Sequence, residues 1–304
     1  MNSIARSLLV AGLAAGACVS AGTTLAQGGP PPQILPEGIR GGSEVVPEPR
    51  VEIRKYLFKE TGEELPYSVF VSSKVKPGQK APLVIALRGF TGTTLTFVRG
   101  TAVDLAEEGG YILVGAIGYN NRAGFGVQAR PRPPAAVATA PGAAAATPPR
   151  GMPPLVGGTA ETDPAKVTAY SEQDVMNVLA MVRKEFKVDD RRIYLMGHSQ
   201  GGGGAEHLAE KYSNIWAGVA LLAPALFDVR LTKDSRILKV PLMLGVGEKD
   251  TLITSVRAFS DQLKALNTAH VYKEFPGLDH GTIIMGSMPE VFRFFPQHVK
   301  PANR

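Results

Sequence analysis

Short, continuously apolar runs alternate with amphipathic stretches along the chain from residue 51 onward. An apolar run such as residues 82–87 is typical of a strand that is buried on both faces of a parallel sheet. Between the runs, apolar residues recur at helical spacing, as at Val175, Val178 and Val182. This alternation predicts an α/β fold with a mainly parallel central sheet and helices on both faces. The predicted strands comprise residues 51–57, 67–71, 82–87, 111–117, 193–196, 216–222, 240–246 and 271–275.

The first two of these strands differ from the others, because polar and apolar residues alternate along residues 51–57. They predict an antiparallel edge pair joined by a turn at residues 61–64. Ser171 and Asp174 have the spacing of a helix start, and Ser287 and Glu290 have the spacing of a capping box. The predicted helices comprise residues 97–108, 171–186, a stretch that begins at 205, residues 256–266, and a last helix from 287 to 295.

Residues 121–164 interrupt the alternation, because they are rich in Pro, Ala and Gly. A segment of this length without predicted elements is unusual inside a domain and indicates either a functional flap or a disordered insertion. The segment has few large apolar side chains that it could bury, which favours disorder.

The N-terminal residues 1–26 have the features of a secretory signal peptide. Arg6 supplies the positive charge, residues 8–17 are apolar but too short to span a bilayer, and Ala26 suits the cleavage position. A lipid anchor on Cys18 is the alternative, and either interpretation predicts a secreted or periplasmic protein. Residues 27–49 then form a Gly/Pro-rich linker ahead of a catalytic domain at residues 50–300.

The composition narrows the classes of function that the domain can have. The chain is 44% hydrophobic and 20% charged, and its net charge of +6 comes from scattered basic residues. Such scatter predicts no nucleic-acid partner. The only cysteine, Cys18, lies in the predicted leader, so we expect no disulfide and no thiol nucleophile in the mature protein. No group of His, Asp and Glu has the spacing of metal ligands, and the sequence predicts no metal and no cofactor.

The segment Gly197-His198-Ser199-Gln200-Gly201 carries the strongest chemical signal. It fits G-x-S-x-G, and it stands between a predicted buried strand and a predicted helix. On such a sharp turn the serine backbone is strained and the hydroxyl is exposed, while glycines two residues away avoid collisions. The pattern therefore predicts Ser199 as a nucleophile.

A nucleophilic serine needs a base and an acid, and both should follow strands at the same edge of the sheet. Among the five histidines only His280 lies in a loop directly after a predicted strand, which makes it the candidate base. Asp250 follows the strand at 240–246 and is the candidate acid, with Glu248 and Asp279 as competitors. The order Ser199, Asp250, His280 is the order found in α/β-hydrolases.

The oxyanion of a tetrahedral intermediate needs two backbone N–H donors. We expect one from Gln200, which follows the nucleophile, and the other from the loop after the strand at 82–87. Phe90 is the candidate in that loop and Thr91 the second choice. His198 and Thr91 are in addition candidate substrate-binding residues, although the side chain of His198 is expected to point away from the serine.

On these residues the chain resembles the serine esterases of the α/β-hydrolase superfamily, over residues 50–298. It is similar to secreted polyhydroxyalkanoate depolymerase-like, feruloyl-esterase-like and prolyl-oligopeptidase-like catalytic domains. The resemblance implies an α/β-hydrolase fold and hydrolysis of carboxylic esters through an acyl-enzyme. One departure concerns the third-strand motif, which usually reads His-Gly and here reads Arg88-Gly89. Arg88 could still brace the loop.

The sequence leaves the substrate open. The segment 223–239 is too short for a cap domain, which favours a small or polymer-end ester at an open site. The alternatives are a prolyl-oligopeptidase-type peptidase, a polyester or feruloyl-ester depolymerase, and a non-catalytic binding module. Residues 27–49 are too few for a propeller domain, and the complete set of catalytic residues disfavours a binding module. No membrane span is predicted, and the oligomeric state is not determined by the sequence.

Overall fold

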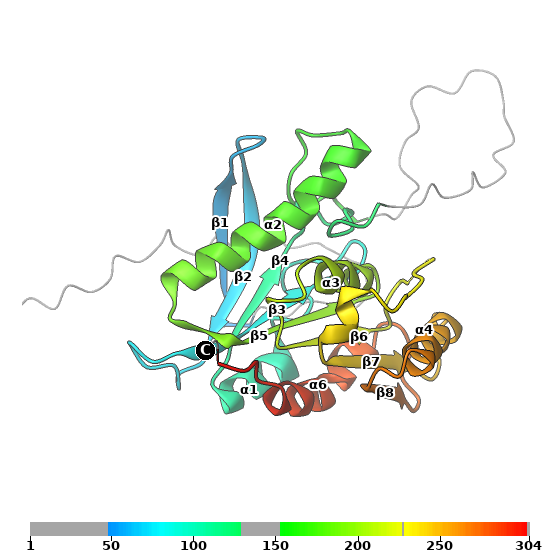
Figure 1. The fold of residues 1–304 in the computed structure, drawn as a ribbon. Coiled ribbons are helices and arrows are strands. Elements are labelled where there is room, and N and C mark those ends of the chain that lie inside the picture. Colours follow the sequence, from blue (N-terminus) through cyan, green and yellow to red (C-terminus); the bar gives the residue numbers. More distant parts are fainter. Residues whose placement is uncertain (1–47, 129–152, 227, 303–304) are drawn as a thin grey trace, which may run out of the picture. The chain divides into compact units, whose positions relative to one another are not determined.

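Eight strands form one hydrogen-bonded sheet in the order β1-β2-β4-β3-β5-β6-β7-β8 (Figure 1). The computed structural model describes residues 48–128, 153–226 and 228–302. The strands are β1 (Glu52–Phe58), β2 (Glu63–Val71), β3 (Ala81–Leu87), β4 (Ile112–Ala116), β5 (Val188–His198), β6 (Gly218–Leu222), β7 (Leu242–Gly247) and β8 (His270–Phe275).

Strand direction divides the sheet into two parts. β1 pairs antiparallel with β2, and β2 pairs antiparallel with β4, with Tyr67 opposite Ala116. From β4 to β8 every pairing is parallel. The predicted antiparallel edge pair and mainly parallel sheet are therefore confirmed, except that β2 begins at Glu63, inside the predicted turn.

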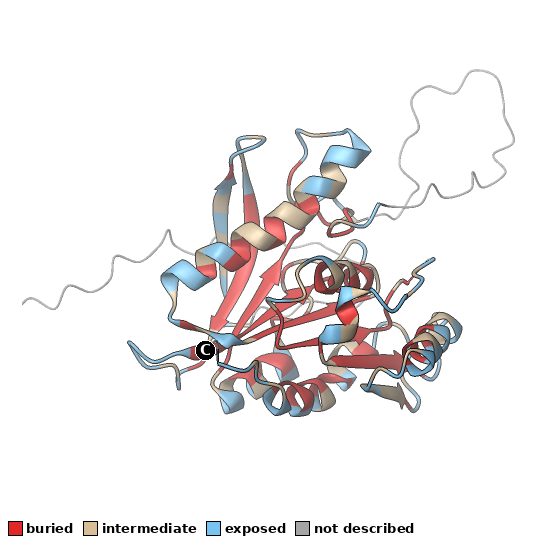
Figure 2. Ribbon diagram, viewed as in Figure 1, coloured by how far each residue is buried: buried red, intermediate tan, exposed pale blue. Residues whose placement is uncertain are grey.

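Helices cover both faces of the sheet. The helix α1 (Gly100–Gly109) packs against α6 (Met288–Phe294) on one face, and Figure 1 shows α2 (Pro164–Glu185) and α3 (Gln200–Lys211) on the other. Every residue of β3, β4, β6 and β7 is buried, as a strand covered on both faces requires (Figure 2). The remaining helices are α4 (Ile253–Ala265), the short α5 (Ile283–Gly286), and the 3-10 turns η1 (Arg236–Lys239) and η2 (Phe295–Gln297).

The start of α2 corrects the predicted helix at 171–186. The helix begins at Pro164, and the side chain of Asp163 caps it by accepting a hydrogen bond from the Lys166 amide at 2.9 Å. Proline suits the first helical position because its missing N–H would have no partner there. Ser171 and Asp174 are therefore interior residues of α2, and both are buried.

The predicted capping box at residues 287–290 is also wrong. The backbone of Ser287 is helical, with φ −87° and ψ −13°, whereas a capping residue needs an extended backbone. Its buried hydroxyl has no hydrogen-bond partner among the described residues. Glu290 instead forms ion pairs with Lys273 at 2.5 Å and Arg293 at 2.6 Å.

The two ends of the Pro/Ala-rich segment are ordered, so the prediction of disorder is wrong for residues 121–128 and 153–163. Asn121 is buried, its amide donates to the Val156 carbonyl at 2.8 Å, and its side chain donates to the Pro154 carbonyl at 3.0 Å. Phe125 is fully buried in the core. Residues 129–152 lie outside the described residues, as do the predicted signal peptide and most of the predicted linker.

The connection from β6 to β7 determines how open the carboxyl edge of the sheet is. Its described residues, 223–226 and 228–241, contain only the 3-10 turn η1. This agrees with the prediction that no large cap domain is inserted there. No helix in the described ranges has the length and apolar character that a membrane crossing needs.

One buried carboxylate makes the stability of the fold depend on pH. Glu206 on α3 is only 9% exposed, and burial together with the nearby charge of Glu210 raises its pKa to about 7. A raised pKa in the folded state means that stability is fully present below the unfolded pKa and is lost as the pH rises through 7.

We therefore expect Glu206→Gln to raise the free energy of unfolding by about 1–3 kcal/mol at pH 8.5 and to change it little at pH 5. Urea unfolding of the two proteins at both pH values measures the difference. An equal effect at pH 5 and pH 8.5 would contradict this origin of the pH dependence.

Candidate active site

The turn between β5 and α3 has the strained geometry that the G-x-S-x-G pattern predicts. Ser199 has φ 54° and ψ −117°, a left-handed backbone that is unusual for a residue other than glycine. A Cβ added to Gly197 would lie 2.0 Å from the Gly201 carbonyl oxygen, and one added to Gly201 would lie 2.3 Å from the carbonyl oxygens of Leu87 and Arg88. Only glycine fits at these two positions.

The next glycines allow α3 to approach its neighbours closely. An added Cβ would collide with Pro224 at Gly202, with the Ala225 carbonyl at Gly203, and with the Phe125 ring at Gly204. The run of four glycines therefore has a packing cause. Because these residues have no side chains, the start of α3 packs closely against the ends of β3 and β6, and this packing fixes the position of Ser199 at the edge of the sheet.

Three of the predicted residues meet at the carboxyl edge of the sheet. His280 Nε2 lies 2.9 Å from Ser199 Oγ, and His280 Nδ1 lies 2.8 Å from Asp250 Oδ2. The side chain of Asp250 is fully buried, whereas that of His280 is 41% exposed. A carboxylate can only accept, so in the neutral imidazole Nδ1 carries the proton and Nε2 is free to accept from the serine hydroxyl.

The competing acids have other partners. Glu248 Oε2 accepts a hydrogen bond from the Gly277 amide at 2.8 Å. Asp279 Oδ1 accepts from the amides of Gly281 and Thr282 and closes the turn that carries His280. Asp250 alone faces the imidazole, and its other oxygen is held by the Leu252 amide at 2.8 Å.

The side chain of His198, a predicted substrate-binding residue, faces the protein interior. Its side chain is buried, and Nε2 lies 2.7 Å from the His280 carbonyl oxygen. Burial and the neighbouring His280 lower the pKa of His198 to about 4, so the ring is neutral at neutral pH. His198 supports the backbone of His280 from behind, and a Cβ added to Gly89 would touch its ring.

Two backbone amides near the serine were predicted to bind an oxyanion, those of Gln200 and Phe90. Within the described residues, neither the Gln200 amide, at the first position of α3, nor the Phe90 amide is hydrogen-bonded. Gly89, beside Phe90, lies against the serine, because its added Cβ would be 3.4 Å from Ser199 Cβ. A helix N-terminus adds a favourable field for negative charge.

Thr91, the second choice, is not available for that role. Its amide already donates to the Asn121 carbonyl at 2.7 Å, and its backbone is left-handed, with φ 60°. This bond ties the loop after β3 to the segment after β4. The side chain of Thr91, a predicted substrate-binding residue, is half-buried, and its hydroxyl has no hydrogen bond to any described residue.

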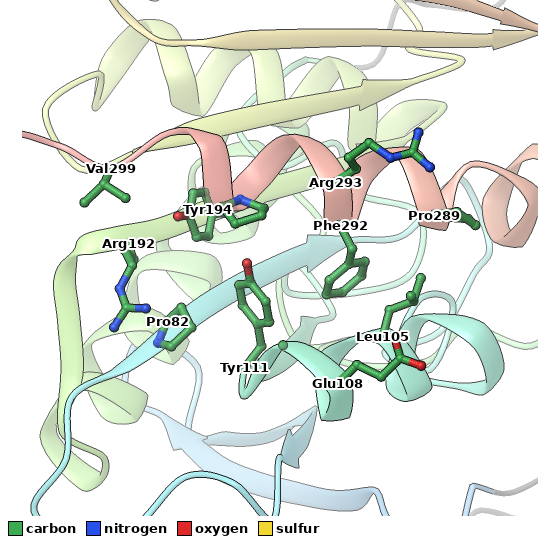
Figure 3. Close-up of a pocket in the computed structure, with 12 residues that line it drawn as sticks. Pro82, Leu105, Glu108, Tyr111, Arg192, Tyr194, Pro289, Phe292, Arg293 and Val299 are labelled. Carbon is green, nitrogen blue, oxygen red and sulfur yellow. The ribbon is translucent and has the colours of Figure 1, made fainter.

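A groove of about 470 Å³ lies at the other end of the sheet (Figure 3). Tyr111, Tyr194 and Phe292 line it, with Arg192 and Arg293 at its rim. Tyr194 precedes Ser199 by five residues of strand, about 16 Å at roughly 3.3 Å per residue. The groove is therefore separate from the Ser199 site. Over the described ranges, no group of three or more His, Cys, Asp and Glu is arranged to hold a metal ion.

An eight-stranded sheet in this order, with a strained serine after β5 and a histidine and an aspartate after later strands, defines an α/β-hydrolase. Residues 68–287 match the dienelactone hydrolase family, and the chain belongs to that family. Its members are hydrolases by description, and the chain is accordingly a hydrolase. A comparison with curated protein sequences found no match.

Solved structures with the same fold include several hydrolases. Fluorophosphonate-binding serine hydrolase F of Staphylococcus aureus is 14% identical, with a TM-score of 0.57 over 81% of this chain and 97% of that one. An S-formylglutathione hydrolase from Agrobacterium tumefaciens is 15% identical, with a TM-score of 0.59 over 82% and 95%. A ferulic acid esterase from Anaeromyces mucronatus is 17% identical, with a TM-score of 0.56 over 87% and 96%. At these identities the likeness shows the fold.

The hydrogen bonds of the two acids give a direct test. We expect Asp250→Asn to slow covalent labelling of Ser199 by a fluorophosphonate about 10²–10⁴-fold, because the amide favours the wrong imidazole tautomer. Glu248→Gln, in the same loop, is the matched control and should change the rate less than about threefold. Equal labelling rates for Asp250→Asn and the unchanged protein would show that Asp250 does not assist His280.

Proposed function

We propose that the protein is a carboxylic-ester hydrolase that works through an acyl-enzyme on Ser199. The proposal rests on two hydrogen bonds of the His280 imidazole: Nε2 lies 2.9 Å from Ser199 Oγ, and Nδ1 lies 2.8 Å from the Asp250 carboxylate. A histidine that bridges a strained, partly buried serine and a buried carboxylate is the arrangement that activates a serine hydroxyl.

Each group has a defined part in the proposed reaction. Ser199 Oγ attacks the ester carbonyl carbon while His280 Nε2 takes the hydroxyl proton. Asp250 stabilises the imidazolium, and the amides of Gln200 and Phe90 bind the developing oxyanion. The imidazolium then gives its proton to the departing alkoxide, which leaves the acyl-enzyme. Water, deprotonated by His280, hydrolyses that intermediate and restores the serine.

The surroundings of the site favour an apolar group on the substrate. Phe90 is 52% exposed, although aromatic side chains are usually covered, and Val127 and Leu155 are exposed as well. Val127 lies on the loop whose Gly124 is beside the Gln200 side chain, and Leu155 lies in the segment that Asn121 holds. Exposed apolar side chains on the loops that follow β3 and β4 are typical of a ligand-binding surface.

We therefore infer an ester with an apolar acyl or aryl group that enters from an open edge, either as a small molecule or as the end of a larger one. The ferulic acid esterase fold neighbour supports an aryl ester. Because residues 1–26 are predicted to be a signal peptide, we further propose that the protein acts on its substrate outside the cytoplasm.

The proposal is tested with p-nitrophenyl esters of increasing chain length and a dipeptide anilide. We expect the esters to be hydrolysed and Ser199→Ala to lower kcat at least about 10³-fold with the fold intact, because the nucleophile is lost. Circular dichroism checks the fold of the variant. Turnover of the anilide in preference to the esters would identify a peptidase, and ester turnover that survives in Ser199→Ala would refute the proposed mechanism.

A further inference from the structure

Arg88 is a charged side chain in the interior of the molecule. It directly follows β3 and is only 1% exposed. The hydrogen bonds of its guanidinium go to carbonyl and amide oxygens, and the group lies 4.7 Å from the centre of the Phe125 ring. Burial lowers its pKa to about 9, so the group is still cationic at neutral pH. The charge of the buried Asp174 carboxylate opposes this shift, but a buried cation without a direct ion pair is still costly unless its hydrogen bonds are satisfied.

Every N–H of the guanidinium has an oxygen acceptor. Nε donates to the Ile117 carbonyl at 3.0 Å, and Nη2 donates to the carbonyls of Asn120 and, at 2.8 Å, Ala123. Nη1 donates to the Gly89 carbonyl at 3.1 Å and to Gln200 Oε1 at 2.9 Å. The five acceptors belong to the loops after β3 and β4 and to the first residue of α3, and the planar guanidinium fixes the directions of the five bonds.

The amides expected to bind the oxyanion are next to these acceptors. The Phe90 N–H belongs to the peptide unit whose oxygen, that of Gly89, accepts from Arg88. The Gln200 N–H belongs to the residue whose side chain accepts from Arg88, and Gln200 Nε2 donates in turn to the Arg122 carbonyl at 2.9 Å. A single side chain therefore bridges the two halves of the oxyanion site.

A second buried charge holds the far side of the same loop. Asp174 on α2 is fully buried and accepts from the Gly118 amide at 2.7 Å and from the Tyr56 hydroxyl at 2.7 Å. Arg88 binds the carbonyls of residues 117 and 120 in that loop. The Asp174 carboxylate thus binds an N–H group of the loop after β4, and the Arg88 guanidinium binds carbonyl groups of the same loop.

We propose that Arg88 is a positioning residue that sets the separation and direction of the Phe90 and Gln200 amides, and so forms the oxyanion site before the substrate binds. The inference rests on the proposed ester hydrolysis. The related enzymes that the sequence resembles usually have histidine at this position, and an imidazole has two nitrogens where the guanidinium has five N–H donors. Arg88 itself does not touch the substrate in this account.

The test compares Arg88→Met, Arg88→Lys and Gln200→Met, which keeps the backbone amide of residue 200 and loses only its side-chain bonds. Arg192→Met, at the other end of the sheet, is the matched control and should keep kcat. We expect Arg88→Met to lower kcat about 10²-fold or more with KM within about threefold, because an oxyanion donor acts on the transition state. Gln200→Met should lower kcat about tenfold, and Arg88→Lys should recover part of the loss.

Two further measurements separate positioning from a merely structural role. The affinity for an alkyl boronic acid, which forms a tetrahedral adduct on serine, should fall in parallel with kcat. Backbone amide exchange in residues 89–92 and 117–123 should become faster in Arg88→Met and stay unchanged in Arg192→Met. If Arg88→Met does not fold, Arg88→Lys and Gln200→Met still decide the question.

A kcat within about threefold of the unchanged protein in both Gln200→Met and Arg88→Lys would overturn the inference while leaving the esterase proposal intact, since the two amides would then keep their positions without the bonds of Arg88. Failure of the unchanged protein to hydrolyse esters or to react with a fluorophosphonate would refute the proposed function instead. Amide exchange would then still show whether Arg88 orders the two loops.

Discussion

The left-handed backbone at Ser199 is the constraint from which the rest of the site follows. A turn this sharp brings the first residues of α3 within contact distance of the carbonyls at the end of β3, so Gly197 and Gly201 have no room for a side chain. Because β5 is in the middle of the sheet, the turn is held on both sides by parallel neighbours, β3 and β6. Strain of this kind persists only where the surrounding structure enforces it.

Hydrogen bonds are the main contacts that hold the turn at Ser199 in its strained conformation. The Ser199 amide donates to the Leu222 carbonyl at 3.0 Å, and the Ser199 carbonyl accepts from the amides of Gly203 and Ala225. Behind His280, the neutral ring of His198 supports the loop, and Asp250 is fixed by the amide of Leu252. Hydrogen bonds to backbone atoms therefore hold Ser199, His280 and Asp250 in place. Backbone atoms have no rotamers to change, so support of this kind gives a preorganised site.

The sequence predicted those parts of the structure that depend on local pattern. Periodicity identified the eight strands, and the G-x-S-x-G spacing together with the rule that sites follow parallel strands selected the residues that meet at the sheet edge.

The predictions from sequence were wrong where contacts between distant segments determine the structure. Asp174 has the spacing of a cap residue but is buried against the Gly118 amide, and Ser287 has capping-box spacing but a helical backbone. The described ends of the Pro/Ala-rich segment fold because Arg88 binds the Ala123 carbonyl and Asn121 binds the Pro154 carbonyl, and composition does not reveal such long-range contacts.

The central claim is that a tetrahedral intermediate on Ser199 is held by the amides of Phe90 and Gln200. A crystal structure of the protein with a bound alkyl boronic acid tests it most directly. The account predicts a covalent bond from boron to Ser199 Oγ, and one boronate oxygen about 2.7–3.1 Å from the backbone nitrogens of both Phe90 and Gln200. A boronate oxygen that contacts neither amide, or an adduct on a residue other than Ser199, would contradict the account.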